Sequence, residues 1–284
     1  MSKQKTAVVV DSTAYIPPAL IQQHNMHVIP LLVNWSGESL RDGVDIMPED
    51  FYKRLATAKE MPSTSQPSAG EFYDLYSKIA EEADSIISLH ISSELSGTTA
   101  SAHAAAKLMD DFPIEIVDSL STSMGLGYIA LLTARAVEQG VDFKKAAADA
   151  RAMIPKARLA FVVDTLEFLH RGGRIGGAQR LFGSMLSIKP LLELQKGRIE
   201  PLDKVRTKRK AVQRLIDLVV EDCAGKSKIH LAAADAGAPQ EAQSMADELQ
   251  KRLNPTELYV TSISPVIGTH TGPGTLGIAW YTED

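Results

Sequence analysis

The chain has 284 residues, of which 44% are hydrophobic and 23% are charged, as is typical of a globular protein with one large or two ordinary domains. Its formal net charge of -5 argues against binding nucleic acid or anionic membranes through overall charge. The single cysteine, Cys223, excludes an internal disulfide and a cysteine-based zinc site. No apolar run is long enough for a membrane span or an export signal, so we expect a cytoplasmic protein without integral membrane association.

The first half of the chain alternates short apolar strands with amphipathic helices. We predict strands at Ala7–Val10, Val28–Val33, Ser85–Ile91 and Ile114–Val117, and helices at Pro48–Ala58, Glu71–Glu82, Thr98–Leu108 and Leu126–Glu138. Ser68 and Glu71 form a capping-box pair that fixes the start of the second of these helices. This alternation predicts a mostly parallel sheet covered on both faces. In such sheets, ligands bind beyond the carboxyl ends of the strands.

The second half begins near Lys156 and has the same two kinds of element. We predict strands at Leu159–Val163, Gly197–Val205, Ile229–Ala234, Tyr259–Ile263 and Leu276–Tyr281, and helices at Thr207–Cys223 and Pro239–Leu253. No low-complexity linker joins the halves. We therefore predict two α/β domains in broad contact, residues 1–155 and 156–284.

Two glycine-containing segments resemble nucleotide-binding motifs but lack their context. Gly225-Lys226-Ser227 would need a glycine five positions earlier, where Val220 stands, and it follows a predicted helix. The segment 125–130 fits G-x-G-x-x-A but begins eight residues after Val117, which ends its strand. The sequence also has no H-E-x-x-H metal motif. We therefore expect no cofactor and no metal.

A serine hydrolase is an enzyme class that the sequence leaves open. No G-x-S-x-G elbow surrounds Ser96, because Glu94 stands two residues before it. Ser96, His270 and Asp11 could still form a triad, since triads are defined by geometry and not by order in the chain. A hydrolase or phosphotransferase that uses Ser96 and His270 therefore stays an alternative.

Four loop segments are rich in small hydroxyl residues and glycine: Pro62–Ser68, Ser92–Thr98, His170–Ile175 and Gly268–Gly274. Ser96 and Gly97 precede a predicted helix, where free backbone N–H groups and the positive end of the helix dipole bind anions. Ordinary helix capping by Ser96 and turn formation at Thr64 are the alternatives. Arg174 could likewise be solvated and His270 a turn residue. The joint occurrence of the four segments favours an anion-binding site.

These segments resemble the DegV family. The quoted motifs read Thr64-Ser65-Gln66-Pro67-Ser68, Ser92-Ser93-Glu94-Leu95-Ser96-Gly97-Thr98, Gly172-Gly173-Arg174-Ile175 and Gly268-Thr269-His270-Thr271-Gly272-Pro273-Gly274, together with Val10–Thr13, Arg41–Ile46 and Asp118-Ser119. The resemblance extends from Ala7 to about Tyr281, which is nearly the whole chain.

The resemblance implies a fatty-acid-binding protein without catalytic activity of its own. It implies an N-terminal, mostly parallel α/β domain and a C-terminal α/β domain with a mainly antiparallel sheet, with the ligand between them. The carboxylate of a long-chain fatty acid would bind Thr64 and Ser96, within a polar network that the resemblance extends to Ser65, Gly97, Arg174 and His270. The protein would present this acid to a separate fatty acid kinase that makes acyl phosphate. A lipid-sensing regulator would share the ligand site and stays an alternative.

The segment Lys204–Lys210 carries five basic residues in seven, at the start of a long predicted helix. Basic residues there cost about 0.3–1 kcal/mol each when exposed, because the helix dipole is already positive at that end. One interpretation is that they dock an acidic face of the partner kinase, with Arg206 foremost because its planar guanidinium suits carboxylate or phosphate. A solvated helix end, offset by Glu200 and Asp203, is the alternative.

Overall fold

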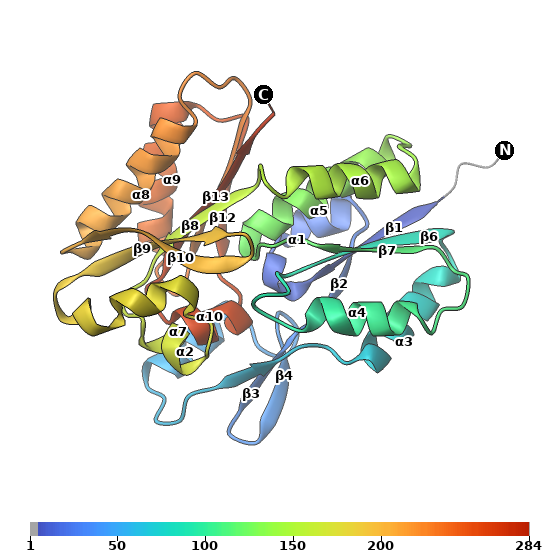
Figure 1. The fold of residues 1–284 in the computed structure, drawn as a ribbon, viewed down its shortest axis with the longest axis horizontal. Coiled ribbons are helices and arrows are strands. Elements are labelled where there is room, and N and C mark those ends of the chain that lie inside the picture. Colours follow the sequence, from blue (N-terminus) through green and yellow to red (C-terminus); the bar gives the residue numbers. More distant parts are fainter. Residues whose placement is uncertain (1–4, 284) are drawn as a thin grey trace.

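The computed structural model describes residues 5–283, and it describes the side chains of all of these except 184–187. Figure 1 shows a parallel sheet from the first half of the chain beside a larger sheet from the second half, with a small third sheet below them. The outer ends of the predicted domains, residues 1–4 and 284, lie outside the described residues. No helix in the described part of the chain is long and apolar enough to cross a membrane.

The first sheet has the strand order β2-β1-β6-β7, and all of its strand pairs are parallel. Its strands are β1 (Thr6–Asp11), β2 (His27–Ile29), β6 (Ser85–His90) and β7 (Ile114–Asp118). The helices α1 (Pro18–Gln23), α5 (Ser123–Glu138) and α6 (Phe143–Met153) cover one face, and α3 (Ala69–Ala80) and α4 (Thr98–Ala106) cover the other. Each face of the sheet has its own hydrophobic core, and alternate residues of β1 contribute to one core or the other. This follows because successive strand side chains point to opposite faces. The predicted parallel sheet covered on both faces is confirmed.

The second sheet has the order β10-β9-β8-β13-β11-β12 and is antiparallel except for the pair β11–β12. Its strands are β8 (Arg158–Val162), β9 (Lys189–Gln195), β10 (Arg198–Val205), β11 (Ile229–Asp235), β12 (Glu257–Ser262) and β13 (Leu276–Thr282). The helices α8 (Lys208–Asp222) and α9 (Pro239–Leu253) pack against it. The predicted fold class, an α/β protein with a mainly antiparallel second sheet, is therefore confirmed, although β9 was not predicted.

The prediction of one strand at Val28–Val33 is wrong. β2 ends at Ile29, and β3 (Leu32–Trp35) begins a separate antiparallel sheet of order β4-β3-β5, with β4 (Glu38–Arg41) and β5 (Ser63–Ser65). Pro30 stands between the two strands. Because proline has no N–H to donate to a strand partner, it ends the pairing with β1 and lets the chain turn into the third sheet.

The third sheet packs against the second half of the chain. Its core contains Val33 and Trp35 of β3 and Phe51 of the helix α2 (Pro48–Ala56). These side chains pack against residues of β11 and against Ile263, which follows β12. The hydroxyl of Tyr52 donates to the carbonyl of Ile263 at 2.9 Å. The predicted division at residues 155 and 156 stays a prediction, and this core crosses it.

Candidate functional site

The candidate site is a narrow, largely apolar cavity. It encloses about 870 Å³ between atoms, including the solvent space at its opening. The centre of a water-sized sphere fits in only about 80 Å³ of this space, so the cavity suits a slender ligand. Its lining is Leu31, Thr64, Ser65, Gln66, Ile91, Leu95, Ser96, Thr122, Ser123, Leu159, Phe161, Leu169, Arg174, Leu194, Ile199, Ala234, Ile263, Val266, Ile267, His270, Thr271, Thr275 and Gly277.

Thr64 and His270 meet at the cavity, although 206 positions separate them. Oγ1 of Thr64, on β5, lies 2.7 Å from Nε2 of His270. The expected loop around His270 is instead the short helix α10 (Pro265–Thr271), which Ser264 caps by accepting a hydrogen bond from the Ile267 N–H. Burial lowers the pKa of His270 to about 4, with a smaller contribution from the charge of Arg174. His270 is therefore a neutral hydrogen-bonding group at physiological pH.

The segment His170–Ile175 closes around His270. Its first two residues end the short helix α7 (Glu167–Arg171). A Cβ atom at Gly172 would overlap Nδ1 of His270, so glycine is needed there for the close approach. The exposed Arg174 donates from Nε to the carbonyl of Leu95 at 3.1 Å and from Nη1 to the carbonyl of Gly172 at 2.7 Å. Its guanidinium thus joins the second and third hydroxyl- and glycine-rich segments.

Ser96 and Gly97 lie at the start of α4, as the sequence predicts. Gly97 is the N-cap residue and forms no side-chain cap, while Oγ of Ser96 lies 2.9 Å from Oγ1 of Thr98. Glycine at 97 also allows contact with Gln66, since a Cβ atom there would overlap the Gln66 side chain. The first and second segments therefore touch, and the cavity lining includes Ser65 from the first, whose hydroxyl accepts a hydrogen bond from Asn34 at 3.2 Å.

Thr122 and Ser123 line the same cavity and were not predicted as site residues. Both hydroxyls are buried without a hydrogen-bond partner, and Ser123 has a left-handed φ of 49°. The helix α5 begins at Ser123, three residues before the predicted helix start at Leu126, and Thr122 is its N-cap residue. The run Ser121-Thr122-Ser123 after an apolar strand was the available signal, because such residues favour helix starts.

The rest of the cavity is apolar and follows the second sheet. Phe161 of β8, Gly277 of β13 and Ala234 of β11 form one row across three adjacent strands, and all three line the cavity. Two of these positions are small, which leaves space above the sheet.

The triad of Ser96, His270 and Asp11 is not assembled in the described structure. His270 contacts Thr64 through Nε2, and its Nδ1 has no partner. Asp11 is fully buried and accepts from Thr13 and from the Ile91 N–H at 2.7 Å.

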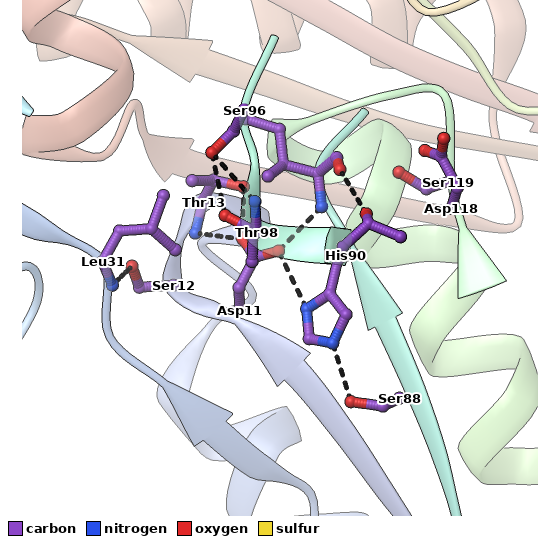
Figure 2. Close-up of polar contacts among 12 residues, drawn as sticks. Asp11, Ser12, Thr13, Leu31, Ser88, His90, Ser96, Thr98, Asp118 and Ser119 are labelled. Carbon is purple, nitrogen blue, oxygen red and sulfur yellow. Dashed lines mark hydrogen bonds and ion pairs between the residues drawn. The ribbon is translucent and has the colours of Figure 1, made fainter. Parts of the chain in front are cut away.

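The carboxylate of Asp11 belongs instead to a buried hydrogen-bond chain. Figure 2 shows Asp11 beside Nδ1 of His90 and Nε2 of His90 beside Ser88, at 3.3 and 2.7 Å. Tyr76 donates to Ser88 at 2.8 Å. Since Asp11, His90 and Ser88 are all 0% exposed, this serine–histidine–aspartate arrangement has no access to a substrate.

Arg206 is not among the residues that line the cavity. It is exposed between the end of β10 and the start of α8, so its place at a strand-to-helix junction is confirmed. Its predicted docking role stays a prediction.

Known proteins resemble this chain along nearly its whole length. A family model described as "Uncharacterised protein, DegV family" matches residues 5–283. A DegV domain-containing protein of Streptomyces coelicolor is 43% identical over 276 residues, which are 96% of this chain and 96% of that protein. A solved structure described as showing fatty acid binding of a DegV family protein from Thermus thermophilus has a TM-score of 0.93 and 35% identity, covering 98% of this chain and 100% of its own. DegV of Bacillus subtilis, described as a fatty acid binding protein, has a TM-score of 0.91 and 36% identity, covering 99% of this chain and 100% of its own.

Proposed function

Because the chain belongs to the DegV family, we propose that it binds a long-chain fatty acid in the cavity and presents it to a fatty acid kinase. The observation that carries the proposal is the meeting of Thr64, Ser96, Arg174 and His270 at a cavity whose other walls are mostly apolar. Fatty acid binding by related structures supports it. The single cysteine, Cys223, is buried and unpaired, in keeping with a cytoplasmic location.

The two parts of the cavity would have different tasks. Burial of a sixteen-carbon tail contributes on the order of 10 kcal/mol gross, at about 0.8 kcal/mol per methylene. A hydrogen bond to a charged group contributes about 1.5–3 kcal/mol net. The tail would therefore supply most of the affinity, and the hydroxyl groups would select and orient the carboxylate.

His270 would set the direction of the Thr64 hydroxyl. A carboxylate accepts hydrogen bonds only, so Thr64 must donate its proton to the ligand. Oγ1 of Thr64 then accepts from His270, which requires a neutral imidazole with the proton on Nε2. The lowered pKa of His270 keeps the ring neutral, and Nδ1, which has no donor opposite it, would be the unprotonated nitrogen.

Ser96→Ala and Thr64→Ala are each expected to weaken palmitate binding by about ten- to a hundredfold, the equivalent of one hydrogen bond to a charged group. The double variant should lose less than the sum, because both hydroxyls would hold one carboxylate. Isothermal titration of the four proteins measures this. Ser93→Ala, an exposed serine in the same loop as Ser96, should bind normally. Strict additivity would assign the two hydroxyls to different groups, and unchanged dissociation constants would refute the site.

Arg206→Ala is expected to leave palmitate binding unchanged and to slow phosphorylation of the bound acid by the kinase about tenfold or more. Loss of a rim charge acts mainly on association with a partner. Rates at several concentrations of loaded protein would separate a weaker docking step from slower chemistry. Lys107→Ala, an exposed basic residue outside the basic segment, is the matched control and should leave phosphorylation normal. Normal phosphorylation by Arg206→Ala, or lost lipid binding, contradicts the docking role.

A further inference from the structure

A second hollow on the molecule, which we call the acidic groove, shares no lining residue with the cavity. It is far wider, since the centre of a water-sized sphere fits in about 820 Å³ of it. Its lining comes from residues 10–30, from the turn and helix start at residues 42–50, and from the end of β12. It includes parts of Val10–Thr13 and Arg41–Ile46, two segments of the family resemblance to which fatty acid binding gives no role.

Exposed apolar side chains gather at this groove. Val28, Val44 and Met47 line it and are 41%, 56% and 46% exposed. They are three of the six large apolar residues that the described structure leaves exposed. Apolar side chains that cluster around a hollow are typical of a surface that another molecule covers.

The groove is also charged with one sign. Its described lining contains the acidic residues Asp42, Glu49 and Asp50, together with the fully buried Asp11, and no lysine, arginine or histidine. Glu49 is paired with Lys53 on the next turn of α2 at 2.6 Å, but Lys53 is not part of the lining. The potential inside such a hollow favours a positively charged occupant.

One oxygen of the Asp42 carboxylate has no hydrogen-bond partner of normal geometry. The Asp42 side chain is 1% exposed, and Oδ2 accepts a hydrogen bond from Ser12 at 2.9 Å, whereas Oδ1 is buried with no hydrogen-bond partner. Burial raises the pKa of Asp42 to about 7, although contacts with Ser12, Ser264 and the backbone N–H of Val266 oppose the shift. A buried acceptor without a donor is unfavourable, and a charged N–H donor is the strongest remedy.

The groove and the cavity are joined by hydrogen bonds through their common wall. Ser12 accepts from the N–H of Leu31 at 3.0 Å, and Asp11 accepts from the N–H of Ile91 at 2.7 Å. Figure 2 shows Ser12 facing the Leu31 nitrogen and the Asp11 carboxylate beside His90. Leu31 and Ile91 line the cavity, so an occupant of the groove lies one layer of residues from a ligand in the cavity.

We propose that the acidic groove is the docking site for a segment of another protein that carries a lysine or arginine between apolar side chains. The apolar side chains would cover Val28, Val44 and Met47, and the cation would donate to Asp42. The proposal does not depend on fatty acid binding. It also differs in charge from the role of the basic segment Lys204–Lys210, which would meet an acidic face.

The test uses the full-length protein and a phage-displayed library of random peptides of about twelve residues. Enriched peptides are expected to combine a basic residue with apolar neighbours. Met47→Asp should weaken their binding at least about tenfold in fluorescence anisotropy, as expected for a residue central to an interface. Asp42→Asn should have a similar effect through loss of the carboxylate charge. Circular dichroism and a melting curve establish that both variants are folded.

Leu108→Asp is the matched control, because Leu108 is 60% exposed and lies outside the groove; it should bind the peptides normally. Peptides without a basic residue would overturn the proposal, as would equal binding to wild type, Met47→Asp and Asp42→Asn, or a selection that yields no groove-dependent peptide. A dimer in sedimentation that Met47→Asp dissociates would also overturn it, because the occupant would then be a second copy. Palmitate titration of Met47→Asp should be unchanged, which keeps this result separate from the fatty acid proposal.

Discussion

Gly277→Leu is expected to lower the affinity for palmitate at least about a hundredfold without unfolding the protein. A Cβ atom at position 277 would lie 3.5 Å from Cβ of Phe161 and 3.6 Å from the carbonyl of Ala160. These are ordinary contacts, so the strand tolerates a side chain there. The side chain would share the cavity face of the sheet with Phe161 and Ala234, its neighbours across the adjacent strands. Displacing about four methylenes of the ligand costs about 3 kcal/mol, which corresponds to more than a hundredfold in affinity.

A graded series sharpens this experiment. Gly277→Ala should have a small effect, Gly277→Val a larger one and Gly277→Leu the largest, because each step removes more of the space above the sheet. Octanoate, whose shorter tail fills less of the cavity, should lose less affinity than palmitate in each variant. Isothermal titration with both acids measures the series. Unchanged palmitate affinity in a folded Gly277→Leu variant would place the tail elsewhere.

Asp42→Asn is expected to stabilise the protein at pH 8 by about 2 kcal/mol. The carboxyl of Asp42 has a pKa of about 7 in the folded protein, against the ordinary value of 3.8 for an aspartate side chain. Between about pH 4 and pH 7, Asp42 keeps its proton in the folded protein and loses it in the unfolded chain. The free energy of unfolding therefore falls as the pH rises through this range. At 1.36 kcal/mol per pKa unit, the full cost above pH 7 is about 4 kcal/mol. Asp42→Asn avoids this cost, but the amide N–H that it introduces has no partner and destabilises the variant by about 1–3 kcal/mol. The net stabilisation is therefore about 2 kcal/mol.

Urea unfolding of both proteins at pH 5 and pH 8 tests the direction in which their stability difference changes with pH. The advantage of Asp42→Asn over the wild type should grow with pH, because only the wild type ionises at this position. Asp50→Asn, an exposed carboxylate of the same groove, should change stability little at either pH. An advantage that shrinks as the pH rises would contradict the raised pKa. A stabilising Asp42→Asn would also mean that any loss of peptide binding by this variant reflects the missing charge and not unfolding.

The sequence predicted the regular elements well where local periodicity determines them. The helix α9 begins and ends where Pro239 and Leu253 were expected to place it, and the capping box of Ser68 and Glu71 forms at the start of α3. These features depend on neighbours a few positions apart. The third sheet depends instead on pairing of β3 with β5 and on packing against distant residues, which no local pattern reveals.

Site residues were likewise predictable from local sequence only where their role depends on neighbouring positions. Ser96, at a helix start, carried a local physical argument, and its place at the start of α4 agrees with it. The contact between Thr64 and His270 required the family resemblance, because nothing local joins them. His270 was expected in a loop since Gly268, Thr269 and Thr271 are weak helix formers. Tertiary contacts of α10 override that preference, including the close packing of Tyr52 on Gly268.

The core shared by the third sheet and the second half also determines when the site appears during synthesis. Ribosomes add about 5–20 residues per second, so the 206 positions between Thr64 and His270 take about 10–40 s to make. Through that interval Val33, Trp35 and Phe51 have not yet met Ile263 and their other partners in the shared core. The polar end of the cavity is therefore completed only after the segment with His270 leaves the ribosome. A nascent chain that ends before His270 therefore has no finished ligand site, and the apolar side chains of its third sheet have not yet been covered by their partners from the second half.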